Sequence, residues 1–248
     1  MYKGLRVVVV IPALNEELAI GHVINDLWCL RSPEQVCIID HIAVCDNGST
    51  DKTAAIADFC GAHVVSQPIA GYGLACLTAI DSLPESDIVL FVDGDRSCDI
   101  SQAILLLEGI FSGDDVAIGS RTLGSMEPGS LTIPQQFGNW FAAFLIKILW
   151  NYKVTDLGPF RAVRTRALRQ IQMNDQSFGW TVEMQVKSII LGLQMNEYPV
   201  DSVVRLGQSK ISGTVKGSIN AGIGILSMIA KLKLKFKKTS KLIATNTN

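Results

Sequence analysis

The sequence has few charged residues, few aromatic residues and no long uninterrupted apolar run. Charged residues make up 18% of the 248 residues and aromatic residues 7%. Two long stretches without a charge, residues 128–146 and 217–230, are either broken by Pro, Gln, Gly and Asn or too short to cross a bilayer, so no membrane-spanning helix is expected. The hydrophobic share of 48% and the chain length are typical of one folded domain with a sizeable core.

The sequence also lacks paired cysteines. All six cysteines lie in the first hundred residues and none forms a CxxC pair: Cys29, Cys37, Cys45, Cys60, Cys76 and Cys98. No secretory leader precedes the first apolar segment. These observations predict reduced thiols in a cytoplasmic protein.

Acidic residues are missing from the last 18 residues, 231–248, which carry six Lys. The rest of the chain has 16 basic and 23 acidic residues, a balance that disfavours a nucleic-acid partner. The basic tail follows apolar residues 219–230, and residues 137–150 place aromatic and aliphatic side chains at helical spacing. These patterns suit peripheral contact with a membrane surface, or equally a buried helix and a solvated tail.

Apolar segments alternate with helix-like segments in the first half of the chain. The expected strands cover residues 5–11, 41–45, 63–66, 88–92 and 116–119, and the expected helices cover 16–30, 51–59, 74–82 and 100–111. This alternation predicts an α/β fold with a mostly parallel sheet, which binds ligands at the carboxyl ends of its strands. The second half, with expected helices at 135–150 and 182–191 and a Gly/Ser-rich run at 207–224, is expected to complete the site.

Polar residues follow three of these expected strands. The first is followed by Ile-Pro-Ala-Leu-Asn-Glu-Glu, where Asn15 is a candidate helix cap. The second is followed by Asp-Asn-Gly-Ser-Thr-Asp, where Asp46 could accept hydrogen bonds from a base or ribose and Asp51 is a candidate cap. The fourth is followed by Asp93-Gly94-Asp95, with Asp99 near by. Two carboxylates this close together suit Mg²⁺ or Mn²⁺ bridging a diphosphate. The glycines of Gly71-Tyr72-Gly73 are a weaker phosphate-binding signal.

The order of the motifs IPALNEE, DNGSTD, GYG, DGD, GSR and FRA resembles the family-2 inverting glycosyltransferases of GT-A (Rossmann-like) fold, over about residues 5–215. Within that family the chain is most similar to the polyprenyl-phosphate (dolichyl-phosphate) mannosyl- and glucosyltransferase branch. The resemblance implies one GT-A domain over residues 1–230, with a donor half (1–122), an acceptor-side helical and loop half (123–230), and a basic tail (231–248). It implies that the nucleotide-sugar pocket is lined by Pro12, Leu14, Glu16, Asp46, Asp93, Gly94 and Asp95.

On the acceptor side the resemblance implies that Arg121 faces the phosphates and that Arg161 belongs to the same region. Gln136 stands where the branch has an arginine that grips the acceptor phosphate, and Ser97 stands where it has a glutamine after the metal carboxylates. The segment from Arg205 to Lys210, which includes Ser209, is similar to the closing loop of the branch.

These residues predict an inverting, metal-dependent transfer of glucose or mannose from a UDP- or GDP-hexose to a polyprenyl phosphate. Asp95 with its metal, together with Arg205 or Lys210, would neutralise the departing diphosphate. An acceptor that is not already an anion needs a base, for which Asp156 is favoured over Glu183. A soluble small-molecule or sugar acceptor is the alternative that Gln136 supports. A nucleotide-binding module or nucleotidyltransferase is disfavoured because IPALNEE lacks a Gly-rich, basic loop.

Overall fold

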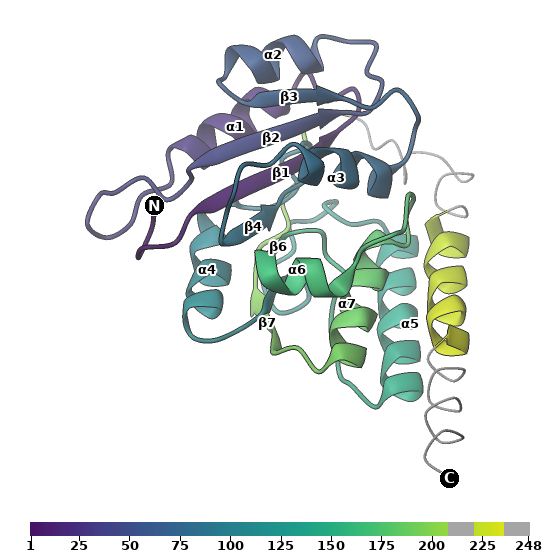
Figure 1. Cartoon of the computed structure of the whole chain (residues 1–248). Helices are drawn as coiled ribbons and strands as arrows, with labels where there is room; N and C mark the ends of the chain where they lie inside the picture. Colours follow the sequence, from purple (N-terminus) through teal and green to yellow (C-terminus); the bar gives the residue numbers. More distant parts are fainter. Residues whose placement is uncertain (208–220, 236–248) are drawn as a thin grey trace.

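The computed structural model describes residues 1–207 and 221–235 and contains a seven-stranded sheet flanked by helices (Figure 1). The strand order is β3-β2-β1-β4-β6-β5-β7, and only β6 runs antiparallel to its neighbours β4 and β5. The strands are β1 (Val7–Ala13), β2 (His41–Asp46), β3 (His63–Ser66), β4 (Ile88–Phe91), β5 (Val116–Ser120), β6 (Arg161–Arg164) and β7 (Met195–Pro199). The expected mostly parallel α/β sheet is confirmed, and both halves of the chain contribute strands to it.

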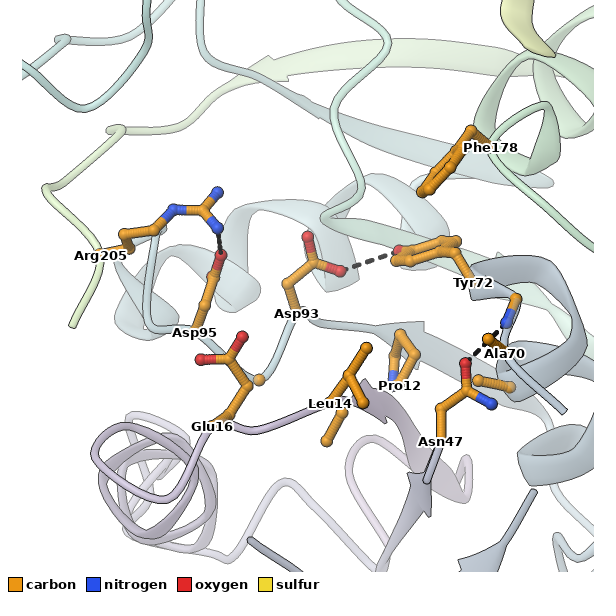
Figure 2. Close-up of a pocket in the computed structure, with 14 residues that line it drawn as sticks. Pro12, Leu14, Glu16, Asn47, Ala70, Tyr72, Asp93, Asp95, Phe178 and Arg205 are labelled. Atoms are coloured by element: carbon orange, nitrogen blue, oxygen red, sulfur yellow. Dashed lines mark hydrogen bonds and ion pairs between the residues drawn. The ribbon is translucent and has the colours of Figure 1, made fainter. Parts of the chain in front are cut away.

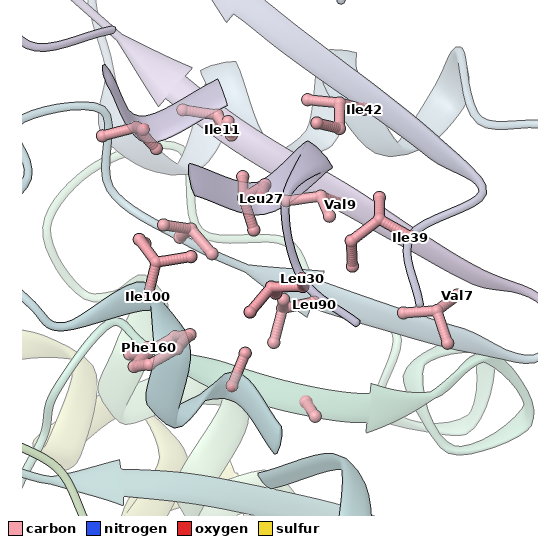
Figure 3. Packing of buried hydrophobic residues seen from close by; sticks show 14 of the residues in the cluster. Val7, Val9, Ile11, Leu27, Leu30, Ile39, Ile42, Leu90, Ile100 and Phe160 are labelled. Carbon is pink, nitrogen blue, oxygen red and sulfur yellow. The ribbon is translucent and has the colours of Figure 1, made fainter. Parts of the chain in front are cut away.

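Helices cover both faces of the sheet because β1 alternates apolar side chains between them. Val7, Val9 and Ile11 pack with α1 (Ile20–Trp28), α2 (Thr53–Phe59) and α4 (Ala103–Phe111), the last preceded by a short 3₁₀ turn, η1 (Ile100–Gln102) (Figure 3). Val8 and Val10 face the other layer. That layer contains α3 (Tyr72–Asp81), α5 (Ile133–Trp150), α6 (Thr165–Ile171) and α7 (Trp180–Leu191).

Residues 221–235 form a further helix beside α5 (Figure 1). Met228, Ile229 and Leu232 are buried in the same core as α5 and α7. Lys233 donates a hydrogen bond to the Leu149 carbonyl, and its Nζ lies 5.3 Å from the centre of the Trp150 ring. The predicted division at residue 230 therefore falls inside a helix. Residues 236–248 of the predicted tail lie outside the described residues.

Two expectations for the first loop need correction. The first helix begins at Ile20 instead of residue 16, and Asn15 does not cap it. Asn15 has a left-handed backbone (φ 53°), and its Oδ1 accepts a hydrogen bond from the Thr50 amide at 2.8 Å. Asn15 thus joins the loop after β1 to the loop after β2.

The six cysteines are all free thiols, as expected from their spacing. Cys45, Cys76 and Cys98 are buried, whereas Cys29 and Cys37 are exposed. None of the helices in the described ranges combines the length and hydropathy that crossing a bilayer requires.

Candidate functional site

A pocket of 220 Å³ opens at the carboxyl ends of β1, β2 and β4 (Figure 2). Parallel strands bring the residues that follow them to one edge of the sheet, which is why loops distant in sequence meet here. Seven of the predicted residues line it: Pro12, Leu14, Glu16, Asp93, Gly94, Asp95 and Arg205. We call this the donor pocket.

Asn47 and Tyr72 also line the donor pocket, although sequence reasoning assigned neither a role. Asn47 is buried, and its side chain donates to the carbonyls of Gln67 and Ile69 and accepts from the Gly71 amide, at 2.7–2.8 Å. These three bonds fold residues 67–71 over the pocket. Tyr72 then donates its hydroxyl to Asp93 Oδ1 at 2.8 Å (Figure 2).

The two glycines around Tyr72 allow close packing, and Gly71 also lines the donor pocket. The amides of Gly73 and Leu74 donate to the carbonyls of Ser177 and Gln176 at 3.2 and 3.1 Å. A Cβ on Gly73 would lie 2.1 Å from the Asp175 carbonyl oxygen. The glycines therefore let the start of α3 dock against the loop that carries Phe178, another pocket residue that sequence reasoning missed.

Asp93 and Asp95 bring two negative charges to one wall of the donor pocket. Burial, followed by the charge of Asp95, raises the pKa of Asp93 above its usual range. Asp95 is 6% exposed, and its Oδ2 lies 2.9 Å from Arg205 Nη1 (Figure 2). Arg205 thus offsets part of this charge from the rim of the pocket.

The residues present fit a divalent cation that is shared with a diphosphate. Within the described ranges, no three Asp, Glu, His or Cys side chains form a metal-binding group. Mg²⁺ is commonly held by one or two carboxylates together with substrate phosphates, and does not need a cage built only from protein ligands. Asp93 and Asp95 can supply the carboxylates, and the crowding of their charges is the property that a cation would relieve.

Two other acidic residues near these motifs do not line the donor pocket. Asp46 closes its own turn, where its Oδ1 accepts from the Ser49 amide at 3.3 Å, and the neighbouring Asn47 takes its place in the lining. Asp99 accepts from the amide and hydroxyl of Ser101 and caps η1.

Arg121 and Asp156 form the best-defined ion pair of the acceptor side. Arg121 Nε and Nη2 donate to the two carboxylate oxygens of Asp156, each at 2.8 Å, and the Arg121 amide donates to Oδ2 at 2.8 Å. Asp156 is fully buried, and the Arg121 side chain is 21% exposed. The predicted base is therefore engaged in orienting the predicted phosphate-binding residue. Within the described ranges Arg121 Nη1 has no hydrogen-bond partner.

Arg161 and Glu183 lie in the interior of the protein and do not line the donor pocket. Arg161 is 1% exposed and donates to the carbonyls of Gly158 and Thr181 and to Gln185 Oε1. Burial lowers its pKa to about 10. Glu183 accepts from the amides of Asn174 and Asp175 and lies 2.8 Å from Lys187 Nζ. Both residues hold loops in place through these contacts.

Gln136 lies on α5 in a second hollow, of 640 Å³, which we call the α5 groove. Its Nε2 donates to the Leu131 carbonyl at 3.1 Å. The groove is mainly apolar, with Lys147 and Lys153 among its lining residues. Thr122 and Thr155, the chain neighbours of Arg121 and Asp156, also line it. Ser209 and Lys210 lie outside the described residues.

Comparison with known proteins gives the fold and the family. The structure is similar to glucosyl-3-phosphoglycerate synthase from Mycobacterium tuberculosis, solved with Mn²⁺, UDP and phosphoglyceric acid: the TM-score is 0.71 at 21% identity, over 93% of this chain and 79% of that one. An uncharacterized glycosyltransferase of M. tuberculosis is 29% identical over 92% of this chain and 99% of its own length. A dolichyl-phosphate hexose transferase of Haloferax volcanii is 29% identical over 85% of this chain and 88% of its own.

The likeness to the synthase confirms the GT-A fold that the motifs indicated. The model of glycosyl transferase family 2 matches residues 8–172, which run from within β1 to the end of α6. The match includes Asp93, Asp95, Arg121 and Asp156. This chain belongs to glycosyl transferase family 2.

Proposed function

We propose that this glycosyltransferase moves a hexose from a UDP- or GDP-hexose to a polyprenyl phosphate, with Mg²⁺ or Mn²⁺ as cofactor. The observation that carries the proposal is the position of Arg121 between the donor pocket, which holds the carboxylates of Asp93 and Asp95, and the mainly apolar α5 groove. Burial and the charge of Asp95 raise the pKa of Asp93, and the positive charge of Arg121 is near enough to oppose this rise, while the adjacent Thr122 lines the α5 groove. A phosphate on Arg121 would thus face the donor pocket, with room for an apolar chain on its other side.

On the donor side, Asp93 and Asp95 are proposed to hold the metal and Arg205 to lie beside the diphosphate. The metal, when bound, supplies electrostatic stabilisation of the departing diphosphate. Pro12, Leu14 and Asn47 form the wall on which the nucleoside would rest. Arg205 already faces Asp95, so it can share its charge with the diphosphate without a large movement.

On the acceptor side, a phosphate supplies its own negative charge and needs no general base. Arg121 can donate from Nη1 while Asp156 holds its other nitrogens, so the guanidinium is fixed in advance of binding. In this proposal Asp156 is a positioning residue. Its role as a base, and that of Glu183, stays a prediction that applies to a neutral acceptor.

A soluble phosphorylated acceptor is the second candidate. It is supported by Gln136, which places a neutral amide where the lipid-phosphate branch has a cation, and by the fold neighbour that was solved with phosphoglyceric acid. Arg121 would serve either acceptor, because the phosphate chemistry is the same. The α5 groove favours a polyprenyl phosphate as the acceptor, since its apolar lining would contact a lipid chain and a small polar acceptor has none.

The test is a transfer assay with UDP- and GDP-hexoses, with Mg²⁺, Mn²⁺ or EDTA, and with a short polyprenyl phosphate or phosphoglycerate as acceptor. We expect transfer to the polyprenyl phosphate that EDTA abolishes and added metal restores. Transfer to phosphoglycerate alone would replace the first candidate by the second. No transfer from any nucleotide sugar would overturn the proposal, and full activity in EDTA would overturn the metal role.

A further inference from the structure

The outer face of α5 carries an apolar stripe along the whole helix. Its members are spaced three or four residues apart and are 44–82% exposed: Ile133, Phe137, Trp140, Phe144 and Ile148. The rings form a continuous row, with centroid distances of 5.8 Å from Phe137 to Trp140 and 5.7 Å from Trp140 to Phe144. A contiguous exposed stripe of large apolar residues marks a surface that meets a partner or a membrane.

The charges around this stripe have one sign. Acidic residues are absent from residues 128–155, and the part of the chain after Asp201 has nine basic residues and no acidic one. The exposed Lys147 and Lys153 lie at the α5 groove, and the helix at 221–235, with Lys231, Lys233 and Lys235, packs beside α5 (Figure 1). The remainder of the chain has a net negative charge, and in the described ranges these five lysines lie on α5 or beside it.

We propose that the α5 stripe docks on an anionic lipid bilayer, with α5 lying in the plane of the headgroups. An amphipathic helix of this kind buries its apolar face in the headgroup and acyl boundary, while nearby lysines attract anionic lipids. Aromatic side chains such as Trp140 favour this boundary. The charge argues for lipid over a second copy of this chain, because two copies meeting at the stripe would bring like charges together.

Docking in this orientation deepens the proposed function, on which this consequence rests. The α5 groove lies beside the stripe, since Trp140 and Phe144 belong to both. An apolar acceptor chain could pass from the bilayer into the groove while its phosphate reaches Arg121. The membrane surface would then be the source of the acceptor.

The experiment measures sedimentation of the full chain with vesicles of phosphatidylcholine, with and without phosphatidylglycerol, in the absence of donor and acceptor. We expect the parent chain to bind the anionic vesicles. The double variant Phe137→Ser with Ile148→Ser should bind them about tenfold or more weakly. Neither Phe137 nor Ile148 lines the α5 groove. The matched control is Phe59→Ser on α2, because Phe59 is 91% exposed but lies on the opposite sheet face. The control is expected to bind like the parent chain.

A second measurement does not depend on polar substitutions. Brominated lipids in the vesicles are expected to quench tryptophan fluorescence in the parent chain, and Trp140→Phe is expected to reduce this quenching, because Trp140 is 57% exposed on the stripe. Absence of binding, equal binding by the double variant, or a stripe-dependent dimer in light scattering would overturn the proposal. Sugar transfer to a short water-soluble polyprenyl phosphate, assayed without vesicles, tests the proposed function separately.

Discussion

At the scale of single residues, the carboxylate of Asp95 is the sharpest test of the donor pocket. Asp95→Asn keeps the side-chain shape but removes a charge that faces Arg205 at 2.9 Å. We expect the affinity for Mn²⁺ with a nucleoside diphosphate to fall by about tenfold or more, since loss of one carboxylate ligand removes a charge that a hard cation requires. Isothermal titration calorimetry measures this affinity directly.

Asp99→Asn is the matched control for this substitution. Asp99 lies four residues further along and caps η1 through Ser101, outside the donor pocket. Its substitution should leave the affinity for metal and nucleotide and the melting temperature unchanged, because Asn caps a helix about as well as Asp. Equal affinities for the Asp95 and Asp99 variants would remove Asp95 from the metal site.

The Arg121–Asp156 pair leads to a second prediction at this scale. Asp156→Asn withdraws a buried negative charge from a guanidinium that it holds by two side-chain hydrogen bonds. We expect a loss of about 3–5 kcal/mol in the free energy of unfolding, as for other broken buried pairs, and a higher KM for the phosphate acceptor with little change in donor affinity. Chemical denaturation and steady-state kinetics measure the two effects.

The pH profile separates a positioning role from a base. If Asp156 only orients Arg121, the shape of kcat against pH for a phosphate acceptor should be the same in the parent and the variant. Loss of the acidic limb in the variant would instead identify Asp156 as the base.

At the scale of elements, the contact between α3 and the loop at 175–178 organises the donor pocket. Gly73→Ala would place a methyl group 2.1 Å from the Asp175 carbonyl oxygen, so the loop and α3 must separate. Because Tyr72 and Phe178 lie on the two sides of this contact, we expect weaker donor binding together with a lower melting temperature. Both are measured on the purified variant by calorimetry.

Gly138→Ala on α5 offers the control, since a Cβ there meets no atom within 4 Å. Alanine is the better helix former by about 1 kcal/mol, so this substitution should raise the melting temperature. If the two variants had similar stability and donor affinity, close packing at Gly73 would not organise the pocket.

The elements that the sequence predicted well are those whose pattern is local. The five strands of the first half are apolar, β-branched segments between polar turns, and all five were found. Two strands were missed. Strand β6 has an arginine at each end, and β7 contains polar residues between its apolar ones. The burial of Arg161 in β6 depends on carbonyls that α7 and the preceding loop provide, and such packing leaves no local signal.

The same distinction explains the outcome for the site. Residues directly after strands, such as Asp93 and Asp95, line the donor pocket because the sheet topology determines where strand ends meet. The roles of Asp156 and Glu183 depend on which side chain each one meets across the fold. Asp156 forms an ion pair with Arg121, which is distant in sequence. Glu183 forms an ion pair with Lys187, which lies on the next turn of the same helix.

At the scale of the whole molecule, the separation of charge predicts how the lipid surface affects transfer. The chain carries its basic excess after Asp201 and near α5, whereas its body is acidic. If both proposals hold, a long-chain polyprenyl phosphate embedded in vesicles should be a better acceptor when phosphatidylglycerol is present. We expect the rate to be several-fold higher than in phosphatidylcholine, because anionic headgroups attract each nearby lysine by about 1 kcal/mol.

Salt should remove this advantage, since the screening length shortens from about 10 Å at 0.1 M to about 3 Å at 1 M. Initial rates at low and high salt, with acceptor in either vesicle, provide the measurement. The rate with a short water-soluble acceptor is the control and should respond little to vesicle composition, because that acceptor reaches Arg121 from solution. Equal rates in neutral and anionic vesicles at low salt would show that the basic side of the molecule does not direct the enzyme to its acceptor.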